Sequence, residues 1–295
     1  MFGMDADRDA SRAQFESRAR RSRAARRRSD REAGSPIAWA RDLDEDRREI
    51  VASVGHELKT PLSIMLALCG RLEAGGRLIA EDAEDVARIR ANAYTMLRRV
   101  QDLMLVARLE SGNLQLEAAA TDVAGIVRHC VEGFRSVADQ RGQDLRIVVP
   151  ESLVAVVDDE KLVSVVSNLV ANAIRHAPPS GVVRCSVRTG PGHLAIEVAD
   201  SGPGVPADQR EQIFERYDRG ADASGTGLGL AIVQEIAKLH GGAVSVGEAP
   251  EGGALFAFEL PLRPVRSAAP RRTRTLAIAD RQKAIVEDLR AELAL

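Results

Sequence analysis

Residues 56–61 read His-Glu-Leu-Lys-Thr-Pro and place a nucleophile, a carboxylate and a hydroxyl within six positions. An imidazole with its ordinary pKa of about 6.5 is largely neutral in the cytosol and can attack phosphorus through one ring nitrogen. Glu57 can accept a hydrogen bond from the other nitrogen, which fixes the tautomer of His56 and raises its basicity. Thr60 lies one helical turn beyond His56 on the same face and could position a water. A lone histidine on a helix is usually structural, but these neighbours predict a phosphoryl acceptor.

A second group of polar residues follows one face of a predicted helix. Asn168 and Asn172 are four residues apart, and Arg175 and His176 continue that face. Amide oxygens suit magnesium, a hard cation that keeps several waters and takes few protein ligands. A guanidinium suits phosphate. The asparagine pair therefore predicts a magnesium site, although surface asparagines are common and the pair alone is a weak signal.

Two glycine-containing turns come next. Asp200 ends an apolar run and could accept a hydrogen bond from an adenine amino group, while Gly202 and Gly204 allow the backbone close to the base. An ordinary turn explains these residues equally well. Farther on, a helix is opened by Gly225, Thr226, Gly227, Leu228 and Gly229. Glycine-rich backbone at a helix N-terminus presents N–H groups and a positive dipole end to phosphates, but the pattern lacks the preceding strand of a dinucleotide-binding unit.

The polar segment between the two turns, from Phe214 to Ser224, contains Arg216 and Arg219. We expect it to act as a mobile lid over ATP, with Phe214 and Arg219 contacting the nucleotide. The alternative is an ordinary surface loop.

The composition limits the function further. A chain of 295 residues with a net charge of −2 accommodates two modest domains and argues against direct nucleic-acid binding. Its three cysteines form no C-x-x-C pair, which favours a reduced, cytoplasmic protein. No apolar run approaches the ~20 residues of a transmembrane segment. We expect any sensing function to come from a separate sensor protein or an upstream sensor region.

The residues that could do chemistry need elements to position them. Apolar residues at helical spacing predict one helix from about Ala40 to Leu72 and another from about Glu81 to Glu110. The second carries a sustained heptad stripe of Val86, Ile89, Ala93, Met96, Val100, Leu103 and Ala107. A single hairpin leaves such stripes half exposed, so the pattern predicts a homodimer with a four-helix bundle. The alternative is a hairpin packed on the rest of its own chain.

The remaining pattern divides the chain into four parts. Residues 1–40 form a basic segment with seven arginines between Arg18 and Arg28, predicted to be disordered, although binding to an anionic surface is an alternative. Residues 41–112 form the hairpin, and residues 113–262 mix helices with short β-rich runs as an α+β layer. Residues 263–295 form a tail with a predicted amphipathic helix from about Arg281. Within the tail, Leu276–Asp280 faintly resembles the opening of a response-regulator receiver domain.

The expected elements of the α+β part are helices over 122–140, 159–176 and 227–239, and strands over 145–149, 154–157, 182–188, 194–198, 243–246 and 254–260.

Taken in order, these motifs resemble those of a sensor histidine kinase of a bacterial two-component system over residues 45–262. The hexapeptide at 56–61 is similar to the phospho-acceptor motif of that family, and residues 168–173 to its asparagine motif. Its two glycine motifs and the phenylalanine motif between them are matched by 200–204, 225–229 and 213–217.

The resemblance implies a dimeric helical-hairpin domain that carries the phospho-acceptor, followed by a GHKL-type α/β sandwich that binds ATP. His56 would be phosphorylated with assistance from Glu57, and the phosphoryl group would pass to an aspartate of a response regulator receiver domain. Thr60 would serve phosphatase activity toward that regulator. Asn172 would hold Mg²⁺ with support from Asn168. Asp200 would read adenine, and the glycines at 225, 227 and 229 would face the phosphates.

Departures from the family pattern are small. His176 stands where tyrosine is frequent and could still stack on adenine, and Arg175 replaces a frequent lysine. Asp218 takes the place of a common aromatic residue. Two other classes remain as alternatives. One is a non-catalytic ATP-binding dimeric scaffold related to histidine kinases. The other is a GHKL ATPase that drives a mechanical or repair cycle, for which His56 and Glu57 have no evident use.

Overall fold

A computed structural model describes residues 58–59, 62–75, 80–110, 116–215, 227–262 and 275–293. Six of the residues predicted to carry function lie outside these ranges, namely His56, Glu57, Thr60, Arg219, Gly225 and Thr226. The predicted basic segment, residues 1–40, also lies outside them. No helix in the described ranges combines the length and apolarity needed to cross a membrane.

The predicted helical hairpin is present. A helix over residues 62–74 is followed by α3, Ala80–Glu110. Leu62 packs with Ala93, Tyr94 and Leu97 of α3 in a small buried cluster. An ion pair of 2.7 Å between Arg90 of α3 and Glu73 ties the two helices together.

The heptad stripe of α3 divides into two sets of residues. Val86, Ala93 and Ala107 are buried within this chain. In contrast, Ile89, Met96 and Leu103 are between 46% and 52% exposed. Because each set repeats every seven residues, α3 uses one seam inside its own chain and leaves a second apolar seam uncovered.

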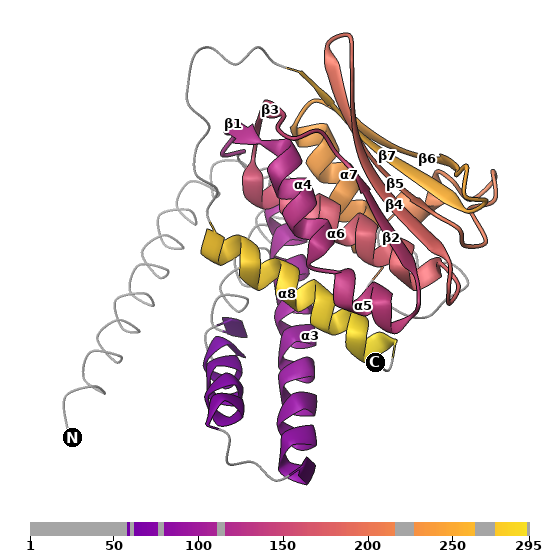
Figure 1. The fold of residues 1–295 in the computed structure, drawn as a ribbon. Helices are drawn as coiled ribbons and strands as arrows, with labels where there is room; N and C mark the ends of the chain where they lie inside the picture. Colours follow the sequence, from indigo (N-terminus) through magenta and orange to yellow (C-terminus); the bar gives the residue numbers. More distant parts are fainter. Residues whose placement is uncertain are drawn as a thin grey trace, which may run out of the picture. The chain divides into compact units, whose positions relative to one another are not determined.

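The described residues between 116 and 262 form two sheets (Figure 1). β1 and β3 form an antiparallel pair, and the larger sheet has the order β2-β4-β5-β7-β6. Only the β2–β4 pairing is parallel. The strands are β1 (Ala119–Asp122), β2 (Asp144–Val148), β3 (Val154–Val157), β4 (Val182–Gly190), β5 (His193–Asp200), β6 (Ala243–Glu248) and β7 (Ala254–Pro261). The mixed sheet was predicted, but β1 was not, because Ala-Ala-Thr-Asp carries little β-propensity without its partner β3.

One face of the larger sheet is covered by helices (Figure 1). They are α4 (Val123–Glu132), α5 (Arg135–Gln140), α6 (Asp159–His176) and α7 (Gly229–Leu239). The prediction of one helix over 122–140 is wrong, since α4 ends at Glu132 and α5 begins at Arg135. The break lies at Gly133, where an added Cβ would overlap the side-chain amide of Gln282, and the following Phe134 is fully buried.

The start of α6 is fixed by its N-cap residue, Asp158. Its carboxylate accepts hydrogen bonds from the backbone N–H groups of Lys161, at 3.1 Å, and Glu117, at 2.9 Å. The backbone N–H of Asp158 in turn donates to Nε2 of His240, just beyond α7, and Nδ1 of that ring lies 2.9 Å from the carbonyl oxygen of Ile236. These bonds assign the proton to Nδ1 and register α6 against the end of α7.

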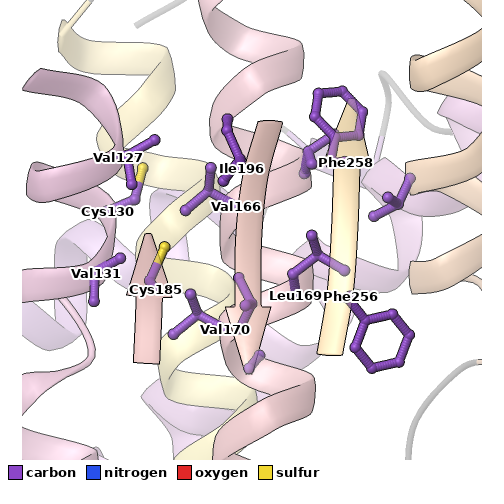
Figure 2. Close-up of a cluster of buried hydrophobic side chains, with 14 of the residues drawn as sticks. Val127, Cys130, Val131, Val166, Leu169, Val170, Cys185, Ile196, Phe256 and Phe258 are labelled. Carbon is purple, nitrogen blue, oxygen red and sulfur yellow. The ribbon is translucent and has the colours of Figure 1, made fainter. Parts of the chain in front are cut away.

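The main core lies between the helices and the larger sheet (Figure 2). Side chains from four elements meet there, including Val127 and Cys130 of α4, Val166, Leu169 and Val170 of α6, Ile196 of β5, and Phe256 and Phe258 of β7. Burial raises the pKa of the thiols of Cys130 and Cys185 to about 12, so both behave as small apolar groups.

The C-terminal tail forms α8, Thr275–Glu292, which begins six residues before the predicted start at Arg281. This helix contacts both α3 and α6 (Figure 1). The tail is therefore integrated into the fold, whereas the sequence indicated only that it was helical.

Truncating Ile196, which is fully buried on the central strand β5, should lower the free energy of unfolding by about 2–5 kcal/mol. The loss combines the lost burial of the side chain with the cost of the cavity. Urea denaturation of Ile196→Ala measures the change. Val148→Ala is the matched control, because this aliphatic side chain on the edge strand is 56% exposed and should shift stability by less than about 0.5 kcal/mol. Equal effects would mean that this side of the sheet is not the core.

Candidate functional site

The polar face predicted on residues 159–176 forms one wall of the candidate site. These residues form α6, and most side chains of this helix are buried. The side chains of Asn172, Arg175 and His176 are among those that are only half-buried. Asn168 is 5% exposed and lies on the same face. An interior helix therefore presents a short polar strip at a place where the core ends.

The orientation of Asn168 is set by its own helix. Its side-chain N–H donates to the carbonyl oxygen of Ser164 over 2.8 Å, so the amide oxygen points away from α6. Two groups approach this oxygen: the guanidinium of Arg98, with an N–O distance of 3.4 Å, and the backbone of Gly229. A Cβ at Gly229 would lie only 3.0 Å from the oxygen. The sequence-distant asparagine and second glycine motifs are thus in contact.

The described part of the second glycine motif has the backbone that glycine favours. Gly227 has a φ of +66°, which side-chain-bearing residues rarely adopt. Leu228 is buried in the core, and α7 begins at Gly229. The buried leucine anchors the start of α7 and fixes its first N–H groups beside the polar strip of α6.

The carboxylate of Asp200 is 2% exposed at the end of β5. Its Oδ1 accepts hydrogen bonds from the backbone N–H groups of Gly202, at 2.7 Å, and Ala254, at 3.3 Å. Burial raises the pKa of Asp200, and these two bonds offset part of that rise. Both of these bonds fall on Oδ1.

The turn after Asp200 fits tightly between α6 and the β6–β7 turn. A Cβ at Gly202 would lie 2.6 Å from the carbonyl oxygen of His176, at the end of α6. Gly253 donates its N–H to the backbone carbonyl of Asp200 over 3.1 Å. Gly204 has a φ of +73° and lies against Gly253. Glycine at 202 is therefore required by close backbone packing.

The β6–β7 turn is held by a paired salt bridge. Arg184 of β4 donates to both carboxylate oxygens of Glu251, with N–O distances of 2.5 and 3.3 Å. This contact lowers the pKa of Glu251 and raises that of Arg184. Because Glu251 and Gly253 belong to the same turn, the ion pair supports the backbone that packs on Asp200.

Phe214 lies in the core. It ends the short helix η1, Gln212–Phe214, and packs edge-on against Phe256 with a centroid distance of 6.4 Å. The described residues therefore show Phe214 anchoring the start of the predicted lid. Contact between Phe214 or Arg219 and a nucleotide stays a prediction.

Sequence reasoning missed three contributors to this site. Arg98 comes from the hairpin, Arg184 from β4, and Ala254 from the start of β7. None of these residues belongs to a local motif, since each contributes through a contact between segments at least 54 positions apart.

Comparisons with known proteins agree with this arrangement. Residues 46–112 match the His Kinase A (phospho-acceptor) domain, and residues 157–264 match the family of histidine kinase-, DNA gyrase B- and HSP90-like ATPases. The chain is 38% identical to the sensor histidine kinase TmoS of Ectopseudomonas mendocina over 229 residues, which cover 75% of this chain and 24% of TmoS. It is 39% identical over 224 residues to the probable sensor histidine kinase TcrY of Mycobacterium tuberculosis, covering 73% of this chain and 46% of TcrY.

Among solved structures, full-length ShkA in complex with AMPPNP is similar with a TM-score of 0.61 and 30% identity. The match covers 80% of this chain and 54% of ShkA. The chain thus spans less than half of TmoS or TcrY and about half of ShkA.

The ion pair between Glu251 and Arg184 predicts that the free energy of unfolding depends on pH. The folded pKa of Glu251 is lowered, so its contribution is present above the unfolded value of about 4.3 and is lost as pH falls through the folded value. Glu251→Gln should lower the unfolding free energy by about 1–3 kcal/mol at pH 7, with a smaller difference below about pH 4. Denaturation across pH values measures this. The exposed Glu259→Gln on β7 should change little, and a pH-independent loss at Glu251 would contradict the ion-pair explanation.

Proposed function

Because this chain belongs to the sensor histidine kinases of two-component systems, we propose that it transfers the γ-phosphoryl group of ATP to His56 and then to an aspartate of a response regulator. The observation that carries this proposal is the meeting of three motifs on α6. Asn168 lies against Gly229, and the carbonyl of His176 lies against Gly202 beside the buried Asp200. Residues separated by up to 61 positions in the sequence thus meet along one helix.

In this proposal, ATP lies along α6 with its base at the Asp200 end. Oδ2 of Asp200 would accept a hydrogen bond from the adenine amino group, and His176 would flank the ring. The triphosphate would extend toward Gly227 and Gly229 at the start of α7, where backbone N–H groups favour anions. Arg175 would supply positive charge to the phosphates.

The asparagines fit a magnesium ion that accompanies ATP. Both offer neutral amide oxygens, and the bond from Asn168 to Ser164 turns its oxygen toward α7. Asn172 would be the ligand and Asn168 its support. When bound, magnesium neutralises charge on the β- and γ-phosphates.

Phosphoryl transfer follows from the acceptor motif. A ring nitrogen of His56 would form a bond to the γ-phosphorus as the bond to the β–γ bridging oxygen breaks and ADP leaves. Glu57 would hold the proton on the other ring nitrogen. The phosphorus–nitrogen bond would then break as an aspartate oxygen of the regulator attacks, which restores His56. Thr60 would position a water for hydrolysis of the phosphorylated regulator.

We also propose that the protein acts as a homodimer. The uncovered apolar seam of α3, formed by Ile89, Met96 and Leu103, is accompanied by exposed apolar residues on the preceding helix. These are Ile64, Met65, Leu68 and Leu72. A second hairpin would bury both sets in a four-helix bundle. The same division gives a phospho-acceptor domain over 41–112 and an ATP-binding domain over 113–262, with the sensory input coming from a separate protein or an upstream region.

The acceptor assignment is tested with γ-labelled ATP. His56→Gln should remove acid-labile labelling of the protein by at least about 100-fold, because glutamine has no nucleophilic ring nitrogen. Its binding of a fluorescent ATP analogue should stay within about two-fold of the parent, since the change lies outside the ATP-binding domain. Labelling equal to that of the parent would reject His56 as the acceptor and leave the scaffold alternative open.

Thr60→Ala is the matched control in the same motif. It leaves the imidazole and its carboxylate in place, so labelling should be preserved. Dephosphorylation of a phosphorylated regulator should slow by about 10-fold or more if the hydroxyl positions the water. An unchanged dephosphorylation rate would remove Thr60 from the proposal.

The adenine contact is tested by Asp200→Asn. The amide oxygen would take the place of Oδ1 and accept from Gly202 and Ala254, so the NH₂ group would face the adenine amine, donor against donor. We expect ATP affinity to fall by about 10-fold or more, the scale of one unmatched buried hydrogen-bonding group. Stability should be retained, because burial already disfavours the charge at this position. Calorimetric titration and thermal unfolding measure the two effects, and unchanged affinity would refute the adenine assignment.

A further inference from the structure

The C-terminal helix α8 belongs to two packing clusters at once. Its Ile285 and Leu289 are part of the main core of the ATP-binding region, together with residues of α4 and α6. Its Ala284 is buried in the small hairpin cluster with Leu62 and Tyr94. Leu62 lies six positions after His56 in the sequence. One helix, which lies beyond both matched domains, therefore joins the ATP-binding region to the hairpin next to the acceptor segment.

Polar contacts hold α8 from both sides. Toward the ATP-binding region, Gln282 donates to the carbonyl oxygen of Cys130 over 2.7 Å, and Arg290 donates to the hydroxyl of Ser136 over 2.5 Å. Toward the hairpin, the ammonium group of Lys283 lies 5.4 Å from the centre of the Tyr94 ring. The docking of α8 is thus specific on both surfaces.

The central contact is an ion pair between Asp288 of α8 and Arg98 of α3. Arg98 is 5% exposed and also lies 3.8 Å from Asp102, so its guanidinium is enclosed by acids from two helices. Arg98 also donates a hydrogen bond to the amide oxygen of Asn168. The helix α8, the hairpin and Asn168 of the proposed nucleotide site therefore meet at the buried guanidinium of Arg98.

The position of Arg98 disfavours binding of magnesium at Asn168. The Asn168 oxygen that would support the ion is engaged by the guanidinium of Arg98, whose own charge is matched by Asp288 and Asp102, so the competition is for the oxygen itself. Because Asp288 holds Arg98 in this place, docking of α8 strengthens the competition. The proposed reaction also requires movement, since His56 must meet ATP and later a regulator, and both partners cannot occupy one imidazole together. A helix that fastens the hairpin to the ATP-binding region restrains that exchange.

We infer that α8 is an intramolecular autoinhibitory strap, which fastens α3 to the ATP-binding region and, through Asp288 and Arg98, competes with magnesium–ATP for Asn168. This inference rests on the proposed function. Binding linkage makes the effect reciprocal: a docked strap weakens magnesium–nucleotide binding, and magnesium–nucleotide loosens the strap.

The test uses the full chain with Asp288→Ala. In magnesium, the affinity for a fluorescent, non-hydrolysable ATP analogue and the initial rate of labelling by γ-labelled ATP should each rise about five-fold or more, the lower end of typical coupling between sites. With EDTA replacing magnesium, the gain in affinity should disappear. A purely structural role for α8 would not make the gain depend on magnesium. Unchanged or weaker binding of Asp288→Ala in magnesium would overturn the inference.

Matched controls come from the adjacent residues. Glu287→Ala removes a neighbouring acid of α8 that makes no ion pair with any residue in the described ranges, and Arg99→Ala removes an exposed arginine next to Arg98. Both should stay within about two-fold of the parent. Arg98→Lys keeps the charge but loses the planar donor geometry, so it should give a partial gain. Gains of equal size in Glu287→Ala would overturn the assignment to Asp288.

Amide hydrogen exchange separates failure of this inference from failure of the proposed function. Saturating magnesium–nucleotide should speed exchange in α8, and Asp288→Ala should do so without nucleotide. If the parent binds no nucleotide at all, the proposed function fails, while the exchange of Asp288→Ala still judges the strap. Exchange in α8 that is identical in Asp288→Ala and Glu287→Ala would overturn the strap in either case.

Discussion

The burial of the Asp200 carboxylate is the constraint on which the ATP-binding region depends. Removing a carboxylate from water costs several kcal/mol unless donors replace the lost hydration. Here the replacement is backbone N–H groups from two separate segments, at Gly202 and Ala254. Both segments must therefore approach closely, which excludes a side chain at Gly202 and requires the Arg184–Glu251 ion pair behind the second turn. The outcome is one oriented acceptor oxygen in a low-dielectric setting, where a hydrogen bond discriminates strongly.

The helix α6 connects the turn after Asp200 with the glycine turn at the start of α7. Apolar residues fill most of its surface because the sheet, α4 and α8 all pack on it, and the polar strip interrupts that surface. Its start is fixed by Asp158 and, through His240, by the end of α7. Since both ends of the strip touch glycine turns, small shifts of α6 would displace both turns together. The rigidity of the core is thus what makes distant motifs act as one site.

The hairpin is built differently, because α3 carries one buried and one exposed apolar seam. One seam of α3 is closed within the chain and by α8, while the other is open and apolar. Arg98 lies on the closed side and contacts Asn168, so a polar contact joins the hairpin to the ATP-binding region in this structure. Burying one seam within the chain leaves the other for the second hairpin of the proposed dimer.

The sequence by itself determined the motifs, their order and most of the elements that carry them. The bounds of α6 and β3 agree with the periodicity, because a buried helix with an N-cap aspartate and a short valine-rich strand are locally encoded. Taken in order, its motifs also resembled those of the sensor histidine kinases. It overlooked β1, which gains its hydrogen bonds only from β3, and the interruption at Gly133, which depends on contact with Gln282 of the tail.

Only the tertiary structure decided which residues support the site and what the tail does. Arg98, Arg184 and Ala254 act through contacts across at least 54 positions, and α8 joins two clusters that no local pattern connects. The physical reason is that periodicity reports which face of a segment is apolar, whereas the identity of the partner depends on shape and charge complementarity assembled in three dimensions.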